Sequence, residues 1–296
     1  MKASPLSWLQ RLPAAFATAA QLLAPRSAVC LLCGKPHDSA RSAATAGQAK
    51  LTFQLRQSLC GACLSAIPWL TRIACSRCGR GIPCDDCIRS PQRTFVCNRS
   101  AVRYNPAMKA MLALYKYRGN EQLAPLLGDM LFPVFEAMTA ELPLEVSTAA
   151  KRKAAMRNPA DYWDAITYVP VSTERARERG FNQAEQLASH LAAHYRLPLV
   201  HVLLRARHSE KQSFKSRSER MRDTKALFSF NEVGLNTIRI LSSASSEKSH
   251  KVSEFIRILL IDDIYTTGST AEACAQVLKQ QAQAPLEIYV LTWARS

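Results

Sequence analysis

Residues 258–270 of the chain read ILLIDDIYTTGST, and this stretch decides how the rest of the sequence is interpreted. The apolar run that opens it is too short for a buried helix and is typical of a buried central strand in an α/β sheet. Asp262 and Asp263 follow at the expected end of that strand, and hydroxyl side chains then surround Gly268. A helical pattern begins directly afterwards. The stretch therefore predicts a strand, a tight turn and a helix N-terminus in succession.

This succession is a geometry that holds a phosphate group, because the first N–H groups of the helix and the positive end of its dipole point at the anion. Gly268 lets the backbone approach closely and adopt a positive φ. Two adjacent carboxylates suit a sugar phosphate better than a bare phosphate, since they accept hydrogen bonds from vicinal hydroxyls. The alternative is a strand end with polar caps and no ligand. The hydroxyls that offer further donors are Thr266, Thr267, Ser269 and Thr270.

The same stretch resembles the phosphoribosyl pyrophosphate (PRPP) signature of type I phosphoribosyltransferases, in which a hydrophobic run and two acids precede T-T-G-S-T. The resemblance implies a type I phosphoribosyltransferase-like α/β domain with a mostly parallel sheet. It also implies that Asp262 and Asp263, the catalytic candidates, bind the ribose hydroxyls, that residues 266–270 hold the 5′-phosphate and that Mg²⁺ accompanies PRPP. The stretch contains neither a Walker loop nor a G-x-G-x-x-G pattern.

The chain carries a large excess of positive charge. Its 296 residues include 39 lysines and arginines and 23 acidic residues, for a formal net charge of +16. Such an excess favours polyanionic partners, such as nucleic acid, phosphorylated substrates or an anionic membrane face. No apolar run approaches the roughly 20 residues that a membrane span needs, so we expect no transmembrane segment.

The N-terminal segment of residues 1–27 superficially resembles a secretion signal, because Lys2 precedes an apolar, alanine-rich run at residues 12–24. Its large apolar side chains, however, fall near one helical face. We therefore predict an amphipathic helix docked on the protein, and the cleaved signal is the alternative.

Ten cysteines occur in the chain, and nine of them precede residue 98. A Cys-x-x-Cys knuckle puts two thiolates on one side of a tight turn, and two knuckles complete a tetrahedral zinc site. Gly34 and Gly79 directly follow two of the pairs, as zinc knuckles often require. We therefore predict a double zinc ribbon over residues 28–98, with structural Zn²⁺ held by Cys30, Cys33, Cys60, Cys63, Cys75, Cys78, Cys84 and Cys87.

The pairing of the knuckles stays open at this stage. Sequential pairing puts the first four of these cysteines on one zinc ion and the next four on another, whereas an interleaved arrangement divides them differently. A third interpretation is the disulfide framework of a secreted protein. Against it, the x-x spacing makes strained disulfides, and a large α/β domain follows. Zinc ribbons are usually structural or interaction modules rather than catalytic ones, because cysteines fill all four coordination positions of the zinc ion.

Two segments between the cysteines and the PRPP signature are strongly basic. Residues 165–171 predict a strand, and Arg175, Arg177 and Arg179 follow it on a loop before a helix that begins at Asn182. Arginines at this place predict an anion site, and the alternative is a surface of salt bridges with the glutamates between them. Further along, a mobile basic arm is expected with Lys211, Lys215, Arg217, Arg220 and Arg222.

The order of these parts resembles the ComF family of competence proteins, also called ComF/GntX. Its pattern is a double zinc ribbon, a Leu/Lys/Tyr stretch ending in glycine, a proline-containing strand before R-x-R-E-R-G-F-N-Q, a basic arm and the PRPP signature. The match covers roughly residues 28–296, and residues 99–296 would be the phosphoribosyltransferase-like domain. Departures from the pattern are Asp223, where asparagine is usual, and insertions at residues 39–50, 143–160 and 242–253. The matching stretches are residues 114–119, 169–170, 175–183, 212–228 and 260–270.

The resemblance implies that the segment after Val169 is a pyrophosphate loop, which adds Arg175 and Arg179 to the PRPP-binding residues, and that the arm is a lid. It also implies a cytoplasmic role in handling single-stranded DNA during natural transformation, with other competence proteins at the inner face of the membrane. The basic residues of the loop and of the arm would then contact the phosphate backbone of the DNA. Aromatic side chains such as Tyr115, Tyr117 and Phe214 would stack on its bases. One alternative is an active PRPP-dependent phosphoribosyltransferase in nucleobase or nucleoside metabolism. A zinc-stabilised scaffold is the other.

Overall fold

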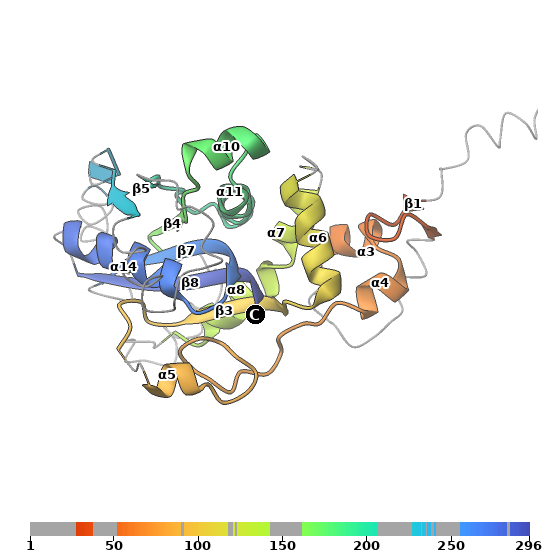
Figure 1. Cartoon of the computed structure of the whole chain (residues 1–296), viewed down its shortest axis with the longest axis horizontal. Helices are drawn as coiled ribbons and strands as arrows, with labels where there is room; N and C mark the ends of the chain where they lie inside the picture. The colour runs from red at the N-terminus through yellow and green to blue at the C-terminus, as the bar shows by residue number, and fades with distance from the viewer. Residues whose placement is uncertain are drawn as a thin grey trace, which may run out of the picture.

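The computed structural model describes most of the chain and builds it around one central sheet (Figure 1). The predicted N-terminal helix, the three insertions and the basic residues of the predicted arm, from Lys211 to Arg222, lie outside the described residues. Those described are 28–37, 52–89, 92–117, 121, 123–142, 162–205, 227–231, 233–234, 236–237, 240, 255–282 and 285–296.

The central sheet has four strands in the order β3-β8-β7-β4, and every neighbouring pair is parallel. The α/β fold with a parallel sheet that the sequence predicts is therefore confirmed. The register aligns Leu260 of β7 with Val290 of β8 and with Thr167 of β4. The strands are β3 (Asn98–Arg103), β4 (Ala165–Tyr168), β7 (Ile256–Tyr265) and β8 (Leu286–Arg295).

Strand β7 is apolar from Ile258 to Ile261 because both faces of the sheet are covered there. Successive side chains of a strand point to opposite faces. Leu259 and Ile261 accordingly belong to one buried cluster, and Ile258 and Leu260 belong to the other. The two clusters are thus the cores on the two faces of the sheet.

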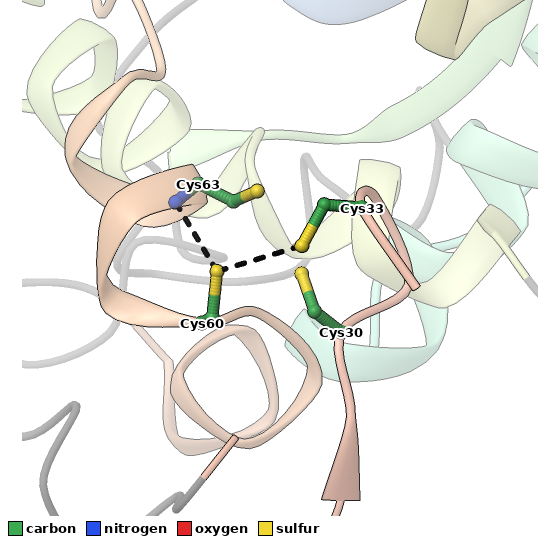
Figure 2. Close-up of side chains that lie close together, drawn as sticks. All are labelled: Cys30, Cys33, Cys60 and Cys63. Carbon is green, nitrogen blue, oxygen red and sulfur yellow. Dashed lines mark hydrogen bonds between the residues drawn. The ribbon is translucent and has the colours of Figure 1, made fainter. Parts of the chain in front are cut away.

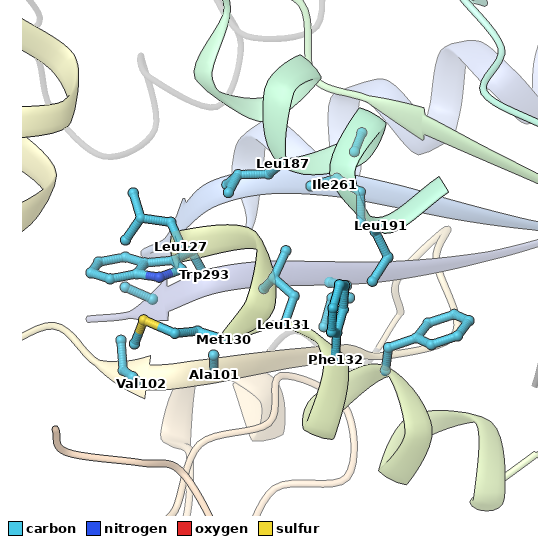
Figure 3. Packing of buried hydrophobic residues seen from close by; sticks show 14 of the residues in the cluster. Ala101, Val102, Leu127, Met130, Leu131, Phe132, Leu187, Leu191, Ile261 and Trp293 are labelled. Carbon is cyan, nitrogen blue, oxygen red and sulfur yellow. The ribbon is translucent and has the colours of Figure 1, made fainter. Parts of the chain in front are cut away.

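Helices α6, α7, α8 and α11 contribute to the first core, and α14 with the β5–β6 hairpin contributes to the second. Figure 3 shows Leu127, Met130 and Leu131 beside Trp293 of the sheet, with Leu187 and Leu191 of α11 next to Ile261. The bounds are α6 (Pro106–Tyr117), α7 (Leu123–Asp129), α8 (Phe132–Ala140), α11 (Gln183–Tyr195), α14 (Ser269–Gln281), β5 (Leu203–Arg205) and β6 (Phe228–Phe230).

The stretch Leu123–Ala140 is long and apolar enough, by length and composition alone, to cross a membrane, and no second such stretch occurs among the described residues. The spacing of the apolar residues predicts one helix from Asn120 to Thr139, but the structure has two helices that are separated at Met130 and Leu131. Pro133 explains the break, because proline is accepted in the first turn of a helix and not in its interior. Most of the stretch is buried inside the protein, where its apolar side chains form the first core.

Both edges of the sheet are covered by short antiparallel or parallel segments. Outside β3, Leu70 N–H donates to Ala101 O at 2.9 Å, and Arg103 N–H donates to Pro68 O at 2.9 Å. Outside β4, Ile166 N–H donates to Pro198 O at 2.8 Å, and Ile166 O accepts from Val200 N–H at 2.9 Å. Each edge strand therefore has hydrogen-bond partners on its outer side.

The cysteine-rich N-terminal part packs against the sheet domain. Leu55, Leu59 and Leu64 are buried in the first core together with side chains of α6 and α7. The carboxylate of Asp129 in α7 also joins the N-terminal part to the sheet domain. Thr52 donates a hydrogen bond to Asp129 Oδ2, and His190 Nε2 lies 2.7 Å from Asp129 Oδ1. The elements of this part are β1 (Ala28–Val29), β2 (Pro36–His37), α3 (Phe53–Ser58), α4 (Gly61–Ser65) and α5 (Asp85–Arg89).

Candidate functional site

The eight knuckle cysteines gather into two groups of four, in which all sulfur atoms lie within 4.8 Å of one another. Figure 2 shows the sulfur atoms of the first group pointing toward one another, with those of Cys33 and Cys60 3.8 Å apart. Tetrahedral zinc with Zn–S bonds of about 2.3 Å also places its sulfur ligands about 3.8 Å apart. The donor set therefore fits Zn²⁺. The groups are Cys30, Cys33, Cys60 and Cys63, and Cys75, Cys78, Cys84 and Cys87, so pairing is sequential and the interleaved alternative is wrong.

Tight turns bring each pair of cysteines together. Gly34 and Gly79 both have a φ of 70°, a left-handed conformation that glycine adopts without strain. Gly79 N–H donates to Cys75 O at 3.0 Å and closes its turn. A Cβ at Gly79 would lie 2.6 Å from Asn98 O, so this knuckle also needs glycine for its close approach to β3.

The thiols of the first group influence one another strongly. Burial opposes ionisation of Cys30, but backbone hydrogen bonds from Cys60, Cys33 and Leu32 lower the pKa of this thiol to about 6. Burial raises the pKa of Cys63, and its neighbouring cysteines raise it further. Because ionisation of one thiol opposes ionisation of its neighbours, all four can be thiolates together only with a cation between them. All ten cysteines lie among the described residues and are free thiols, which gives no support to the disulfide framework.

The two acids of the signature lie within β7, which continues to Tyr265, so the prediction that the strand ends before them is wrong. The strand continues because β8 pairs with it as far as Tyr265. Asp263 N–H donates to Asp262 Oδ1 at 2.8 Å. Burial raises the pKa of Asp262 to about 7, and the charge of Asp263 adds to this shift. The site therefore holds a carboxylate that titrates near neutrality.

Lys116 at the end of α6 forms an ion pair with Asp263 and was not assigned to the site from sequence. Both side chains are largely buried, at 14% and 19% exposure. The Leu/Lys/Tyr stretch was the only sequence signal for this residue.

The hydroxyl-rich turn follows β7 and leads into α14, as predicted. Gly268 is the residue before the helix, with a φ of 79° and no side chain to cap it. Thr267 Oγ1 accepts from Ser269 N–H at 3.4 Å and donates to Ser269 Oγ at 3.1 Å. Ser269 and Thr270 lie in the first helical turn, where backbone N–H groups have no partner within the helix. The turn thus presents hydroxyls and N–H donors together.

Arg295, at the end of β8, supports this turn from the sheet side. Its Nη1 donates to Thr266 O at 2.8 Å and to Tyr265 O at 3.2 Å, and its guanidinium lies 4.8 Å from the centre of the Tyr265 ring. Arg93 Nη2 also donates to Thr267 O at 3.3 Å. No local sequence pattern marks these arginines, because the contacts depend on how distant segments meet.

The three arginines after β4 lie on a helix, α10 (Thr173–Arg179), rather than on the predicted loop. Ser172 caps its N-terminus and Gly180, with a φ of 81°, ends it, so local signals for a helix were present. Arg177 is exposed, whereas Arg175 is partly buried. Arg179 donates to Gln183 Oε1 at 2.8 Å. The structure therefore places these arginines differently, and Arg177 faces solvent.

Arg205, at the end of β5, is a further candidate that sequence reasoning missed. Burial lowers the pKa of its guanidinium, the charge of Arg175 lowers it further, and Asp262 acts in the opposite direction. Arg205 therefore lies within electrostatic reach of both α10 and the acidic pair. Its guanidinium also lies 5.4 Å from the centre of the Phe228 ring.

Tyr115 cannot stack on a nucleotide base as predicted, because it is fully buried. Its hydroxyl donates to Gln186 Oε1 at 2.9 Å, and its ring lies 5.2 Å from that of Phe181. The side chain of Tyr117 and the whole of Phe214 lie outside the described part of the structure. Asn182 does cap α11 as expected, since its Oδ1 accepts from Ala184 N–H at 3.1 Å.

These features define a class of protein: an α/β protein with a parallel four-stranded sheet and an N-terminal part with two four-cysteine groups, consistent with a zinc ribbon. No family model matches the chain. It is similar over most of its length to proteins named for competence and DNA utilization, and these similarities support a ComF family protein, as the order of motifs predicts.

Three relatives illustrate the similarity. Competence protein ComFC of Bacillus subtilis (strain 168) is 29% identical over 265 residues, which cover 86% of this chain and 90% of that protein. Competence protein ComFC of Streptococcus pneumoniae is 26% identical over 266 residues, covering 88% and 98%. DNA utilization protein YhgH of Salmonella typhimurium is 24% identical over 250 residues, covering 79% and 89%.

Proposed function

We propose that the chain acts in natural competence as a ComF-like protein that handles incoming single-stranded DNA, and that its sheet domain binds PRPP. The proposed location is the cytoplasm, with other competence proteins at the inner face of the membrane as partners. The names of the relatives support the role in competence. The observation that carries the PRPP proposal is the meeting of an acidic pair, a hydroxyl-rich turn and a helix N-terminus at one end of β7.

Each part of PRPP has a matching group in this arrangement. The turn offers Thr266, Thr267 and the first N–H groups of α14 to the 5′-phosphate. Asp262 and Asp263 can accept hydrogen bonds from the ribose hydroxyls. Arg205, within electrostatic reach of Asp262 and Arg175, adds positive charge that a pyrophosphate group needs. The raised pKa of Asp262, caused by burial and by Asp263, also fits an oxygen-ligand cation such as Mg²⁺ arriving with PRPP.

The nucleic-acid role rests on charge. The chain has a net charge of +16, and Arg177 on α10 is exposed and available to a phosphate backbone. Arg175 and Arg179 stand on the same short helix. The basic residues of the arm extend this proposal, although they lie outside the described residues.

A second candidate function is an active phosphoribosyltransferase, in which an acceptor base displaces pyrophosphate at C1 of PRPP. The ion pair between Lys116 and Asp263, with Arg205 near Asp262, favours this candidate. Fixed charges of both signs around one ligand can position reactants and stabilise charge that develops in a transition state.

Calorimetric titration of one zinc-loaded preparation with PRPP and with a single-stranded oligonucleotide tests the proposal. We expect both ligands to bind. The double variant Asp262→Ala with Asp263→Ala should lose PRPP binding and keep oligonucleotide binding and zinc content. Unchanged PRPP affinity in the double variant would contradict the assignment of the site.

Pyrophosphate release from PRPP in the presence of nucleobases separates the two candidate functions. Turnover without oligonucleotide binding supports the enzyme. Oligonucleotide binding without turnover supports the role in DNA handling.

A further inference from the structure

The two cysteine groups pack against opposite faces of the sheet. Cys30 belongs to the first core, whereas Cys78, Cys84 and Cys87 belong to the second, which also contains side chains of α14. We call residues 266–268 with the first turn of α14 the phosphate turn. The second group therefore shares its core with the helix that begins in the phosphate turn.

A single guanidinium joins the second group to the phosphate turn. Arg295 Nη2 donates to Cys78 Sγ at 3.7 Å, and Nη1 of the same side chain donates to Thr266 O at 2.8 Å. Arg295 is only 5% exposed, so water competes little for these bonds. Because the guanidinium is planar and rigid, the sulfur and the carbonyl are held at a fixed separation.

The residues that follow the second group contact the same turn. Thr94 donates through its N–H and its hydroxyl to the carboxylate of Glu272, at 3.0 Å and 2.6 Å, in the first turn of α14. Arg93 donates to Thr267 O. The ring of Phe95 meets that of Tyr265 edge-on at 6.3 Å between centres.

The second group is itself anchored to the sheet. Asn98 Nδ2 donates to Cys78 O at 3.1 Å, and Asn98 N–H donates to Arg77 O at 2.7 Å. Asn98 is fully buried in β3, so the knuckle is held against a rigid element. The chain of contacts therefore runs from the sheet through the cysteine group to the turn.

The first group has a different environment. Its hydrogen bonds in the described residues run within the ribbon, as from Leu31 N–H to Ser58 O at 3.0 Å and from Leu64 N–H to Cys60 O at 2.9 Å. Its surroundings are tied to α7 and α11 through Thr52, Asp129 and His190. The two groups thus provide a matched comparison within one chain.

We propose that the second cysteine group, through Arg295, positions the phosphate turn, so that zinc in this group sets the affinity of the turn for PRPP. The inference rests on the proposed PRPP site. Four thiolates with one Zn²⁺ carry a net charge of about −2, and the bound sulfur of Cys78 is then an anionic acceptor for Arg295. When the metal is lost, nothing holds the four cysteines together, and Cys78 no longer fixes Arg295 against the turn.

The test compares Arg295→Met and Cys84→Ser with Cys33→Ser, the matched control in the first group. Zinc content, PRPP affinity by calorimetry and amide hydrogen exchange of the phosphate turn are measured on each full-length protein. Arg295→Met should keep its zinc, bind PRPP about tenfold more weakly and exchange faster in the turn. Cys84→Ser should lose one zinc ion with the same effects on the turn. Cys33→Ser should lose one zinc ion and leave both PRPP affinity and turn exchange unchanged.

Arg295→Lys keeps the charge but not the planar fork, so an intermediate affinity is expected. Unchanged affinity and turn exchange in Arg295→Met would overturn the proposal, even where Cys84→Ser does not fold. Equal effects of Cys33→Ser and Cys84→Ser would also overturn it, because the metal would then act on the whole fold. Failure of the unaltered protein to bind PRPP contradicts the proposed function instead, and hydrogen exchange of the turn still decides whether Arg295 positions it.

Discussion

Lys116 forms an ion pair with Asp263, and this contact joins the C-terminal end of α6 to the strand that carries the acidic pair. The contact supplies the one cation that faces Asp263 among the described ion pairs. The positive charge of Lys116 also lowers the pKa of Asp262, although burial and Asp263 outweigh it. Lys116 at the end of α6 therefore contributes positive charge to the candidate site.

Replacement of Lys116 by methionine should destabilise the protein, because it leaves two neighbouring carboxylates without this cation. We expect a loss of about 1–3 kcal/mol at pH 8 in urea unfolding, and a smaller loss at pH 5, where Asp262 is mostly protonated. Lys109→Met, an exposed position on the same helix, is the control. An equal loss in both variants would show that the helix and not the ion pair is responsible.

The raised pKa of Asp262, about 7, makes stability depend on pH. An acid whose pKa is higher in the folded state binds its proton more tightly there, so this group lowers stability as pH rises from about 4 to about 7. Asp262→Asn removes the effect. The variant should melt above the unaltered protein at pH 8, and its advantage should shrink toward pH 5. A pH-independent difference in melting temperature would contradict this assignment.

Gly268→Ala should weaken the fold of the phosphate turn. The φ of 79° costs a side-chain residue about 1–2 kcal/mol, and the new Cβ would lie 2.1 Å from the Tyr265 hydroxyl oxygen. We expect destabilisation of at least about that size in urea unfolding, with loss of PRPP binding. Gly61→Ala is the matched control, since a Cβ at this position meets nothing within 4 Å and should be tolerated.

Elemental analysis of protein expressed in the cytoplasm should find two zinc ions per chain, one for each four-cysteine group. A strong chelator should lower the melting temperature, because metal binding contributes to folding. One ion would mean that one group stays unfilled. A preparation without zinc and with oxidised thiols would favour the disulfide framework instead.

Binding of single-stranded DNA should weaken steeply with salt, by about 0.7 log units per decade of salt for each phosphate that the protein neutralises. If half of the eight candidate basic residues on α10 and the arm take part, the slope should be near −3, roughly three log units per decade. Replacing Arg217, Arg220 and Arg222 with alanine should flatten this slope for all sequences alike. Lys279→Ala, at an exposed position on α14, should leave it unchanged. Weak, salt-independent binding would contradict the DNA-handling role.

The sequence predicts those parts of the site in which a local pattern carries the chemistry. The strand, turn and helix around Gly268 and the knuckles at Gly34 and Gly79 follow from residue spacing and from the freedom of glycine to adopt a positive φ. These features depend on a few neighbouring residues. They were therefore predictable without knowledge of the tertiary structure.

The missed parts of the site depend on segments that are far apart in sequence. Lys116, Arg205 and Arg295 reach the acidic pair or the turn only because the sheet brings distant segments together. The helix α10 was missed for another reason, since its caps at Ser172 and Gly180 were visible but its arginines were interpreted as a loop. Tertiary burial likewise removed Tyr115 from the surface.

The covered edges of the sheet have a consequence for handling the protein in concentrated solution. A free edge strand offers unpaired N–H and C=O groups to a second molecule and is a route to aggregation. Here residues 68–70 occupy the outer side of β3, and residues 198–200 occupy that of β4. Neither edge is therefore open to strand addition by another copy. This protects a central sheet rich in isoleucine and leucine from aggregation through its edge strands.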